Sequence, residues 1–259
     1  MIDLHCHILP NVDDGAGSVK ESVLMAMAAV KDGIHTIVAT PHTLNEVYLN
    51  PVAEVTRKVA ALQQVFLKTG VDARLYPGAD VHLCPNLQTQ IEQGNAGTIN
   101  NAGKYILLEL PSQTVPERIK DTVFALKLKG ITPIITHPER NTVIQHDAEI
   151  LYELVCMGVL SQVTAMSLTG DFGSFVQHVS EELVRYRLVH VIASDAHSSL
   201  SRPPVLSQAV EHAAEILGNY EEATCMVSRV PEDILSGKPC DIAEPINPTA
   251  KARAFGRTF

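Results

Sequence analysis

Segments that suit β-strands alternate with segments that suit helices along most of the chain. Strands at this spacing are expected to be parallel and joined by right-handed helical crossovers. The strand-like segments are short apolar runs, which is typical of strands covered on both faces. We therefore expect an α/β fold, built either as a closed barrel or as an open doubly wound sheet. The seven expected strands lie within residues 1–5, 35–42, 73–80, 104–110, 131–140, 159–166 and 189–197.

Two of the helices have clear start and stop signals. Ser18 is followed three residues later by Glu21, which is a capping box. Asn50 and Pro51 form a cap followed by proline in the first turn, and Gly70 ends the apolar stripe that begins there. Further helices are expected near residues 87–91, 116–129, 147–157, 175–186, 204–217 and 220–228.

Composition excludes several classes of protein. Hydrophobic residues make up 46% and charged residues 19% of the 259 residues, as in globular proteins. No run approaches the ~18 apolar residues that span a bilayer, and Asp3 and His5 interrupt any early signal-peptide core. The net charge of −9 argues against nucleic acid as a partner. Five scattered cysteines indicate reduced thiols, and hence the cytoplasm.

The organisation of the chain predicts a single domain over residues 1–236. No repeat, low-complexity stretch or linker interrupts it. Residues 237–259 form the expected C-terminal tail, which ends in the basic stretch KARAFGRTF. We interpret this basic stretch, residues 251–259, as a loosely held terminus, with partner binding as the lesser alternative.

Histidines and acids collect at the carboxyl ends of the expected strands. Six of the seven strands end in such a residue. In parallel barrels and in open α/β sheets alike, these ends form the functional rim. His82 is ambiguous, because it would share the face of the residue two positions before it. The nine candidates at this rim are His5, His7, Asp14, His42, Asp80, Glu109, His137, Asp195 and His197.

Nine nitrogen and oxygen donors are more than one metal ion can use, since zinc takes about four ligands and octahedral metals about six. The set therefore predicts two or three divalent ions. Without thiolates it fits Mn²⁺, Fe or Zn and disfavours a structural zinc site. Clustered divalent ions generate hydroxide near neutral pH and hold both oxygens of an in-line displacement at phosphorus. The rim therefore predicts a metal-dependent phosphatase.

Two arginines follow the rim residues closely. Arg140 lies three residues after His137, and Arg202 five after His197. Each could bind phosphate oxygens bidentately and act as a catalytic residue. The alternative for each is a surface salt bridge.

Cys6 resembles the nucleophile of a cysteine phosphatase, because it follows a histidine. The H-C-x5-R loop of those enzymes needs arginine six residues after the cysteine, where this chain has Val12. We expect Cys6 to point away from its two histidine neighbours and into the core.

The motifs DLHCHILPNVDDGAGS, VATPH, GAD, LLELP, ITHPER and IASDAH, in this order, resemble those of the PHP (polymerase and histidinol phosphatase) superfamily. Within it, residues 1–235 are most similar to the bacterial manganese-dependent protein-tyrosine phosphatases of capsule and exopolysaccharide operons. This resemblance implies a distorted seven-stranded (β/α) barrel with a trinuclear metal site. It also implies hydrolysis of phosphotyrosine on a bacterial tyrosine autokinase that controls polysaccharide export.

The resemblance also implies roles for individual residues. Arg140 and Arg202 match the positions that bind phosphate, and Asp80 stands where the family usually has a bridging glutamate. Aspartate is one methylene shorter, so bridging two ions would need a backbone shift or would leave one ion weakly bound. The three ions would be held by His5, His7 and Asp195, by Glu109 and His137, and by Asp14, His42 and His197.

Several alternatives remain open at this point. The same rim could serve a phosphoesterase for a small molecule such as histidinol phosphate. An amidohydrolase-type barrel is disfavoured, since the sixth strand ends VTAMSL without histidine. A catalytically inactive, kinase-binding scaffold is disfavoured by the complete ligand set. The general acid would be His42 or a metal-bound water, and the sequence leaves the native metal and the oligomeric state open.

Overall fold

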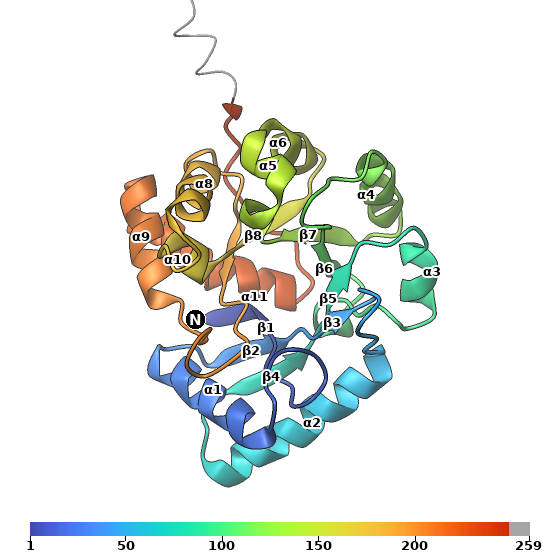
Figure 1. Cartoon of the computed structure of the whole chain (residues 1–259), viewed down its shortest axis with the longest axis vertical. Helices are drawn as coiled ribbons and strands as arrows, with labels where there is room; N and C mark the ends of the chain where they lie inside the picture. Colours follow the sequence, from blue (N-terminus) through green and yellow to red (C-terminus); the bar gives the residue numbers. More distant parts are fainter. Residues whose placement is uncertain (249–259) are drawn as a thin grey trace, which may run out of the picture.

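Nine parallel strands form the interior of the protein (Figure 1). The computed structural model describes residues 1–248, so residues 249–259, with the basic end of the expected tail, lie outside the described part. The strands are β1 (Ile2–Cys6), β2 (Thr36–Ala39), β3 (His42–Thr43), β4 (Arg74–Pro77), β5 (Asp80–His82), β6 (Tyr105–Glu109), β7 (Thr132–Thr136), β8 (Leu160–Thr164) and β9 (Val191–Ala193).

The strands are divided between two sheets. One has three strands in the order β1-β2-β4, and the other has six in the order β3-β5-β6-β7-β8-β9. The α/β class and the parallel strands are confirmed. The expected division into seven strands is wrong for the second and third, because each is broken into two short strands that enter different sheets. Within residues 1–248 the two sheets are not assigned as one closed barrel.

Local chemistry explains both breaks. The second expected strand breaks at Thr40 and Pro41, and proline has no N–H to donate to a neighbouring strand. The third breaks at Gly78, whose backbone passes so close to β2 that an added Cβ would lie 2.8 Å from Val38 Cγ1. After the breaks, the register pairs His42 directly with Asp80. The register is the same before and after the breaks, and it places two site candidates side by side.

Hydrogen bonds join the first strand to the chain that follows the last one. The Asp195 N–H donates to the His5 carbonyl (2.8 Å), and the His7 N–H donates to the Ala196 carbonyl (2.9 Å). Asp3 is buried and accepts bonds from the Ser194 N–H (2.9 Å) and hydroxyl (2.5 Å). Burial raises the pKa of Asp3 to about 6 against these bonds. The first motif, around His5 and His7, is therefore held against the last motif, around Asp195 and His197.

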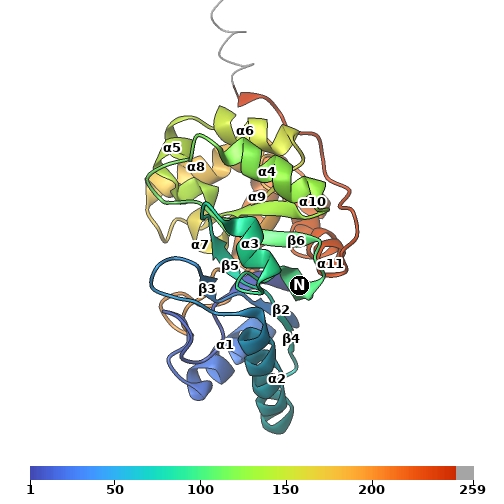
Figure 2. The same cartoon turned by 90° about the vertical axis from the view of Figure 1, so that its right-hand side faces the viewer.

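Helices surround the strands (Figures 1 and 2). The two views place α1 and α2 beside the three-stranded sheet, and α4 and α8 beside the six-stranded one. No helix within residues 1–248 has the length and apolar character needed to cross a membrane. The helices are α1 (Val19–Lys31), α2 (Val52–Thr69), α3 (Leu87–Glu92), α4 (Ile119–Leu128), α5 (Thr142–His146), α6 (Glu149–Cys156), α7 (Ala165–Leu168), α8 (Ser174–Arg185), α9 (Ser207–Leu217), α10 (Tyr220–Cys225) and α11 (Arg229–Leu235), with 3-10 turns at Ile99–Asn101 and Pro138–Arg140.

The helix signals are confirmed in part. The capping box is only half formed, because Glu21 Oε1 accepts the Ser199 N–H (2.6 Å). The Ser18 side chain accepts the Glu21 N–H at the start of α1 (3.1 Å), and Gly70 ends α2 with φ 74°. Asn50 does not cap α2, because Pro51 occupies the cap position without a side-chain bond. The Asn50 amide instead donates to the carbonyls of Val12 (3.1 Å) and His42 (2.8 Å). Asn50 therefore ties two rim loops together.

The described part of the expected tail is held against the domain. The Tyr105 hydroxyl donates to the Lys238 carbonyl (2.6 Å), and the Ile246 N–H donates to the Tyr186 carbonyl (2.8 Å). The loose terminus was expected for the basic stretch at residues 251–259, which lies outside the described residues.

His190 lies directly before β9, and its imidazole is buried. Its Nδ1 accepts the Ser161 N–H (3.1 Å), and burial lowers the pKa of His190 to about 4. Below pH ~6.5 the unfolded chain binds a proton here that the folded chain does not. The resulting contribution to stability is therefore complete above pH ~6.5 and is lost as the pH falls toward 4.

We expect His190→Gln to flatten this pH dependence. Between pH 7 and pH 5, the free energy of unfolding of the wild type should fall by about 2 kcal/mol more than that of the variant. Urea unfolding at both pH values measures the difference. His178→Gln, at an exposed position on α8, is the matched control. Equal losses in wild type and His190→Gln would contradict the assignment.

Candidate metal centre and phosphate pocket

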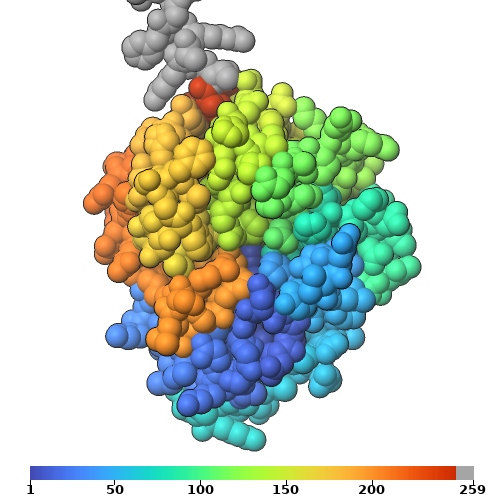
Figure 3. All heavy atoms as spheres, in the orientation of Figure 1, coloured from blue at the N-terminus to red at the C-terminus, as the bar shows by residue number. Residues whose placement is uncertain are grey.

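The loops that follow the strands meet around a cavity of about 250 Å³. Segments far apart in the sequence, coloured blue, green and orange, meet at the centre of this face in Figure 3. His5, His7 and Asp80 are fully buried beside it. All nine predicted rim residues are therefore brought into one region. The cavity is lined by the other six candidates, by both arginines and by neighbouring residues: Asp14, His42, Glu109, His137, Asp195, His197, Arg140, Arg202, Leu110, Ser112, Thr136, Pro138 and Asn141.

Three overlapping groups of side chains have metal-ligand geometry. In each group one donor atom per residue lies within 4.8 Å of the others. His7, His42 and Asp80 each belong to two groups. Three groups agree in number with the three ions that the resemblance implies, although Asp195 and His137 fall outside them. The groups are His7, Asp14, His42 and His197; His5, His7 and Asp80; and His42, Asp80 and Glu109.

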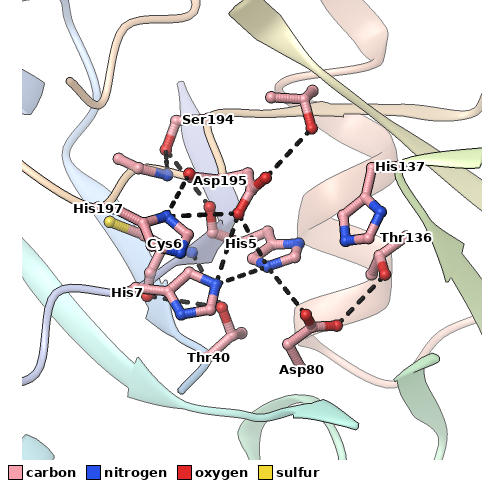
Figure 4. A network of polar contacts seen from close by, with 12 residues as sticks. His5, Cys6, His7, Thr40, Asp80, Thr136, His137, Ser194, Asp195 and His197 are labelled. Atoms are coloured by element: carbon pink, nitrogen blue, oxygen red, sulfur yellow. Dashed lines mark hydrogen bonds and ion pairs between the residues drawn. The ribbon is translucent and has the colours of Figure 1, made fainter. Parts of the chain in front are cut away.

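Hydrogen bonds at Nδ1 orient three imidazoles that lie close together, those of His5, His7 and His197 (Figure 4). His5 donates to Gln162 Oε1 (2.8 Å), His7 donates to Asp13 Oδ2 (2.7 Å), and His197 donates to a backbone carbonyl (2.8 Å). An Nδ1–H donor leaves the Nε2 lone pair free for a cation. The outer partners therefore select the tautomer that a metal site requires.

Two of these Nε2 atoms lie unusually close together. His5 Nε2 and His7 Nε2 are 3.0 Å apart, and Asp195 Oδ1 lies 3.5 Å from each. Burial alone would lower the pKa of His7, but hydrogen bonds with Asp13 and Asp195 raise it to about 10. Two lone pairs at this distance need a positive charge between them. A divalent cation bound by both nitrogens would supply that charge.

Asp80 gives the second test of fit. Its Oδ2 and His42 Nδ1 are both buried and 3.1 Å apart, yet neither makes an aligned hydrogen bond. Asp80 Oδ1 accepts only a long bond from the Thr136 hydroxyl (3.3 Å). Burial would raise the pKa of Asp80, but the positive field of His5 and His42 holds it well below its usual range. Buried donor atoms without partners suit a cation.

Glu109 forms the other side of the centre. Its Oε2 lies 3.7 Å from His42 Nδ1, and its Oε1 lies 3.7 Å from His137 Nε2. His82, left ambiguous by the sequence, is 3.3 Å from Glu109 Oε2, and this bond raises the pKa of His82. His82 therefore neighbours the candidate ligands without joining any of the three groups.

The backbone is strained where it enters the site. His137 and Asp195 have φ of 36° and 51°, in the left-handed region that favours glycine. Such conformations persist where the surrounding structure holds them and often mark functional positions. Gly15 packs closely against His7, and an added Cβ would lie only 2.1 Å from the His7 carbonyl oxygen. The loop after β1 can fold back over His7 only with glycine here.

Both arginines bind the same carboxylate oxygen. Asp195 Oδ2 accepts from Arg140 Nη2 (2.5 Å) and from Arg202 Nη2 (2.8 Å). The guanidinium carbons lie 5.6 and 5.7 Å from the centre of the Phe172 ring. The alternative that these arginines form surface salt bridges is wrong, since they converge on a carboxylate that is 2% exposed.

Cys6 is part of the core, as expected. Its side chain is fully buried, and burial raises the pKa of its thiol. A buried, protonated thiol is not a nucleophile. The rejection of cysteine chemistry is confirmed.

The residues that support the ligands were not predicted from the sequence. Asp13 and Gln162 orient His7 and His5. Glu139 is buried and accepts bonds from the Ser167 hydroxyl (2.6 Å) and a backbone N–H, which holds the turn that carries Arg140. A signal was available for Gln162, because an amide inside the apolar strand β8 must find a partner.

Comparison with known proteins identifies the family. The family described as "Capsular polysaccharide synthesis, CpsB/CapC" matches residues 1–236. Tyrosine-protein phosphatase YwqE of Bacillus subtilis is 36% identical over 256 residues, 99% of each chain, and tyrosine-protein phosphatase CpsB of Streptococcus pneumoniae is 28% identical over 223 residues, covering 84% of this chain and 91% of that one. A crystal structure from a study of these two proteins, described as metal-dependent tyrosine phosphatases, superposes with a TM-score of 0.91 at 36% identity, covering 95% of this chain and 99% of that one. The chain therefore belongs to the CpsB/CapC family of capsular polysaccharide synthesis proteins, and the resemblance inferred from its motifs is confirmed.

Proposed function

We propose that this protein is a metal-dependent phosphatase that hydrolyses phosphotyrosine on a bacterial tyrosine autokinase of capsule or exopolysaccharide synthesis. The observation that carries the proposal is the convergence of three ligand groups and two arginines on one cavity. Membership of a family whose relatives are named tyrosine-protein phosphatases supports the substrate class.

The donor set suits two or three divalent ions, with Mn²⁺ favoured and Fe or Zn as alternatives. Bound there, such ions would supply water activation near neutral pH and positive charge for the phosphate oxygens. We assign His5, His7 and Asp195 to one ion, Glu109 and His137 to a second, and Asp14, His42 and His197 to a third, with Asp80 shared between neighbouring ions. Asp80 suits a shared role because it belongs to two of the ligand groups.

The remaining chemistry falls to the chain itself. Arg140 and Arg202 would bind the equatorial phosphate oxygens and stabilise the charge that develops on them. The leaving phenolate has a pKa of ~10, so it needs little help from a general acid. His42 lines the cavity and is our candidate for that acid, because the negative charge of the nearby Asp80 raises the pKa of His42 against the effect of burial.

The proposal extends to the organisation of the chain. We assign residues 1–236 to one phosphoesterase domain. We describe the two sheets as parts of a distorted seven-stranded barrel in which β2 with β3, and β4 with β5, each count as one broken strand. The two broken strands and the bonds between His5 and Asp195 and between His7 and Ala196 support that description. Five free cysteines support a cytoplasmic location.

The test is hydrolysis of a phosphotyrosine peptide before and after metal removal. We expect exhaustive chelation to abolish phosphate release, added Mn²⁺ to restore it, and elemental analysis to find at least two ions per chain. Histidinol phosphate, assayed in parallel, should be a poor substrate. Activity that survives chelation would refute metal dependence, and a preference for histidinol phosphate would refute the substrate class. Fewer than two ions would favour a non-catalytic scaffold.

A further inference from the structure

An aromatic ring lies within cation–π distance of both arginines of the phosphate pocket. Phe172 is half-buried in the loop between α7 and α8, and the guanidinium carbons of Arg140 and Arg202 lie 5.6 and 5.7 Å from its ring centre. Both distances fall within the range of cation–π attraction. One ring therefore contacts both cations that face the cavity.

We propose that Phe172 is a positioning residue that holds Arg140 and Arg202 in place for phosphate binding, an inference that rests on the role proposed for the two arginines. The arginines come from loops that follow β7 and β9, and Phe172 comes from the loop that follows α7. The ring is thus a third element that fixes the distance between two independently carried groups.

The charges show why such a support is needed. Two guanidinium groups repel each other, and in this structure both are neutralised by one oxygen, Asp195 Oδ2. A bound phosphate would give both guanidinium groups other oxygens to bind, so their charges would no longer be neutralised by Asp195 alone. The contact with Phe172 involves no lone pair that phosphate or a cation would take. It therefore persists while the polar partners of the arginines change.

The loop that carries Phe172 is built to present it. The Asp171 N–H donates to the Met166 carbonyl (3.0 Å), and the Gly173 N–H donates to the Gly170 carbonyl (2.9 Å). Gly170 and Gly173 have φ of 88° and 95°, which other residues rarely adopt. These turns fix the backbone on both sides of the ring, so its position does not depend on the arginines alone.

The experiment compares Phe172→Leu, Phe172→Ala and Phe172→Tyr in the Mn²⁺-loaded enzyme. We expect leucine and alanine to raise the dissociation constant of inorganic phosphate and the KM for a phosphotyrosine peptide by about tenfold, because two cation–π contacts are lost. Tyrosine keeps the ring and should stay within about twofold of wild type. Bound metal per chain should not change. Phe175→Leu, at a ring that is 54% exposed three residues further on, is the matched control.

Wild-type phosphate binding in Phe172→Leu would overturn the proposal, and so would a tyrosine variant as weak as alanine. If Phe172→Ala fails to fold, the leucine and tyrosine variants still decide. Calorimetry with inorganic phosphate needs no turnover. A failure to hydrolyse phosphotyrosine would therefore count against the proposed function alone, whereas an unchanged phosphate constant would count against Phe172.

Discussion

Replacing His7 with alanine should lower kcat/KM for a phosphotyrosine peptide by on the order of 10³, since removal of one preorganised electrostatic group already costs about 10²–10³. His7 belongs to two of the three ligand groups, so its loss weakens two candidate ion positions. Its Nε2 lies 3.0 Å from that of His5, and Asp13 fixes its orientation from the other side. Elemental analysis should find fewer ions per chain than in wild type.

The matched control is Cys6→Ser, one residue away on the opposite face of β1. The Cys6 side chain is buried in the core, so serine should affect stability more than metal content or kcat. Thermal unfolding of both variants separates a loss of fold from a loss of ions. Full activity and full metal content in His7→Ala would remove the basis of the assignment. An inactive but folded and metal-loaded Cys6→Ser would point instead to the thiol.

Periodicity predicted the elements better than it predicted how the strands pair. The stripe of α2 was visible because Val55, Val59, Leu62 and Phe66 recur at helical spacing, and all four are buried. The breaks at Pro41 and Gly78 could not be seen in the sequence, because each lies within a run of residues that looks like one continuous strand. A single glycine can be explained by close packing against another strand only when the position of that strand is known. The division into two sheets therefore depends on contacts between distant segments.

The candidate ligands could be predicted because all lie where strands end, and parallel strands bring those ends to one rim. The supporting residues lack that regularity. Asp13 precedes a predicted ligand in the same loop, yet only the folded loop shows that Asp13 orients His7 whereas Asp14 approaches His42 and His197. Phe172 has no metal-ligand chemistry and lies 23 residues before Asp195. Its relation to the arginines arises only from packing.

Arg140→Ala and Arg202→Ala should each lower kcat/KM for the phosphotyrosine peptide by on the order of 10², because each removes a charge-assisted donor to the phosphate. The double variant should lose less than the product of the two single effects. Both arginines bind one oxygen of Asp195 and contact one ring, so each helps to hold the other. Arg202→Lys should recover only part of the loss, since lysine keeps the charge without the planar fork.

Metal content distinguishes this effect from damage to the metal centre. The arginines bind Asp195 Oδ2, whereas Oδ1 faces His5 and His7. Removing either arginine leaves Asp195 Oδ1 available to a metal ion. The number of ions per chain should therefore stay at the wild-type value while phosphate binding weakens. A double-mutant cycle on kcat/KM, with elemental analysis of each variant, measures both quantities. Fully additive losses would show that the arginines act separately. A parallel loss of ions would show that they support the metal centre rather than bind phosphate.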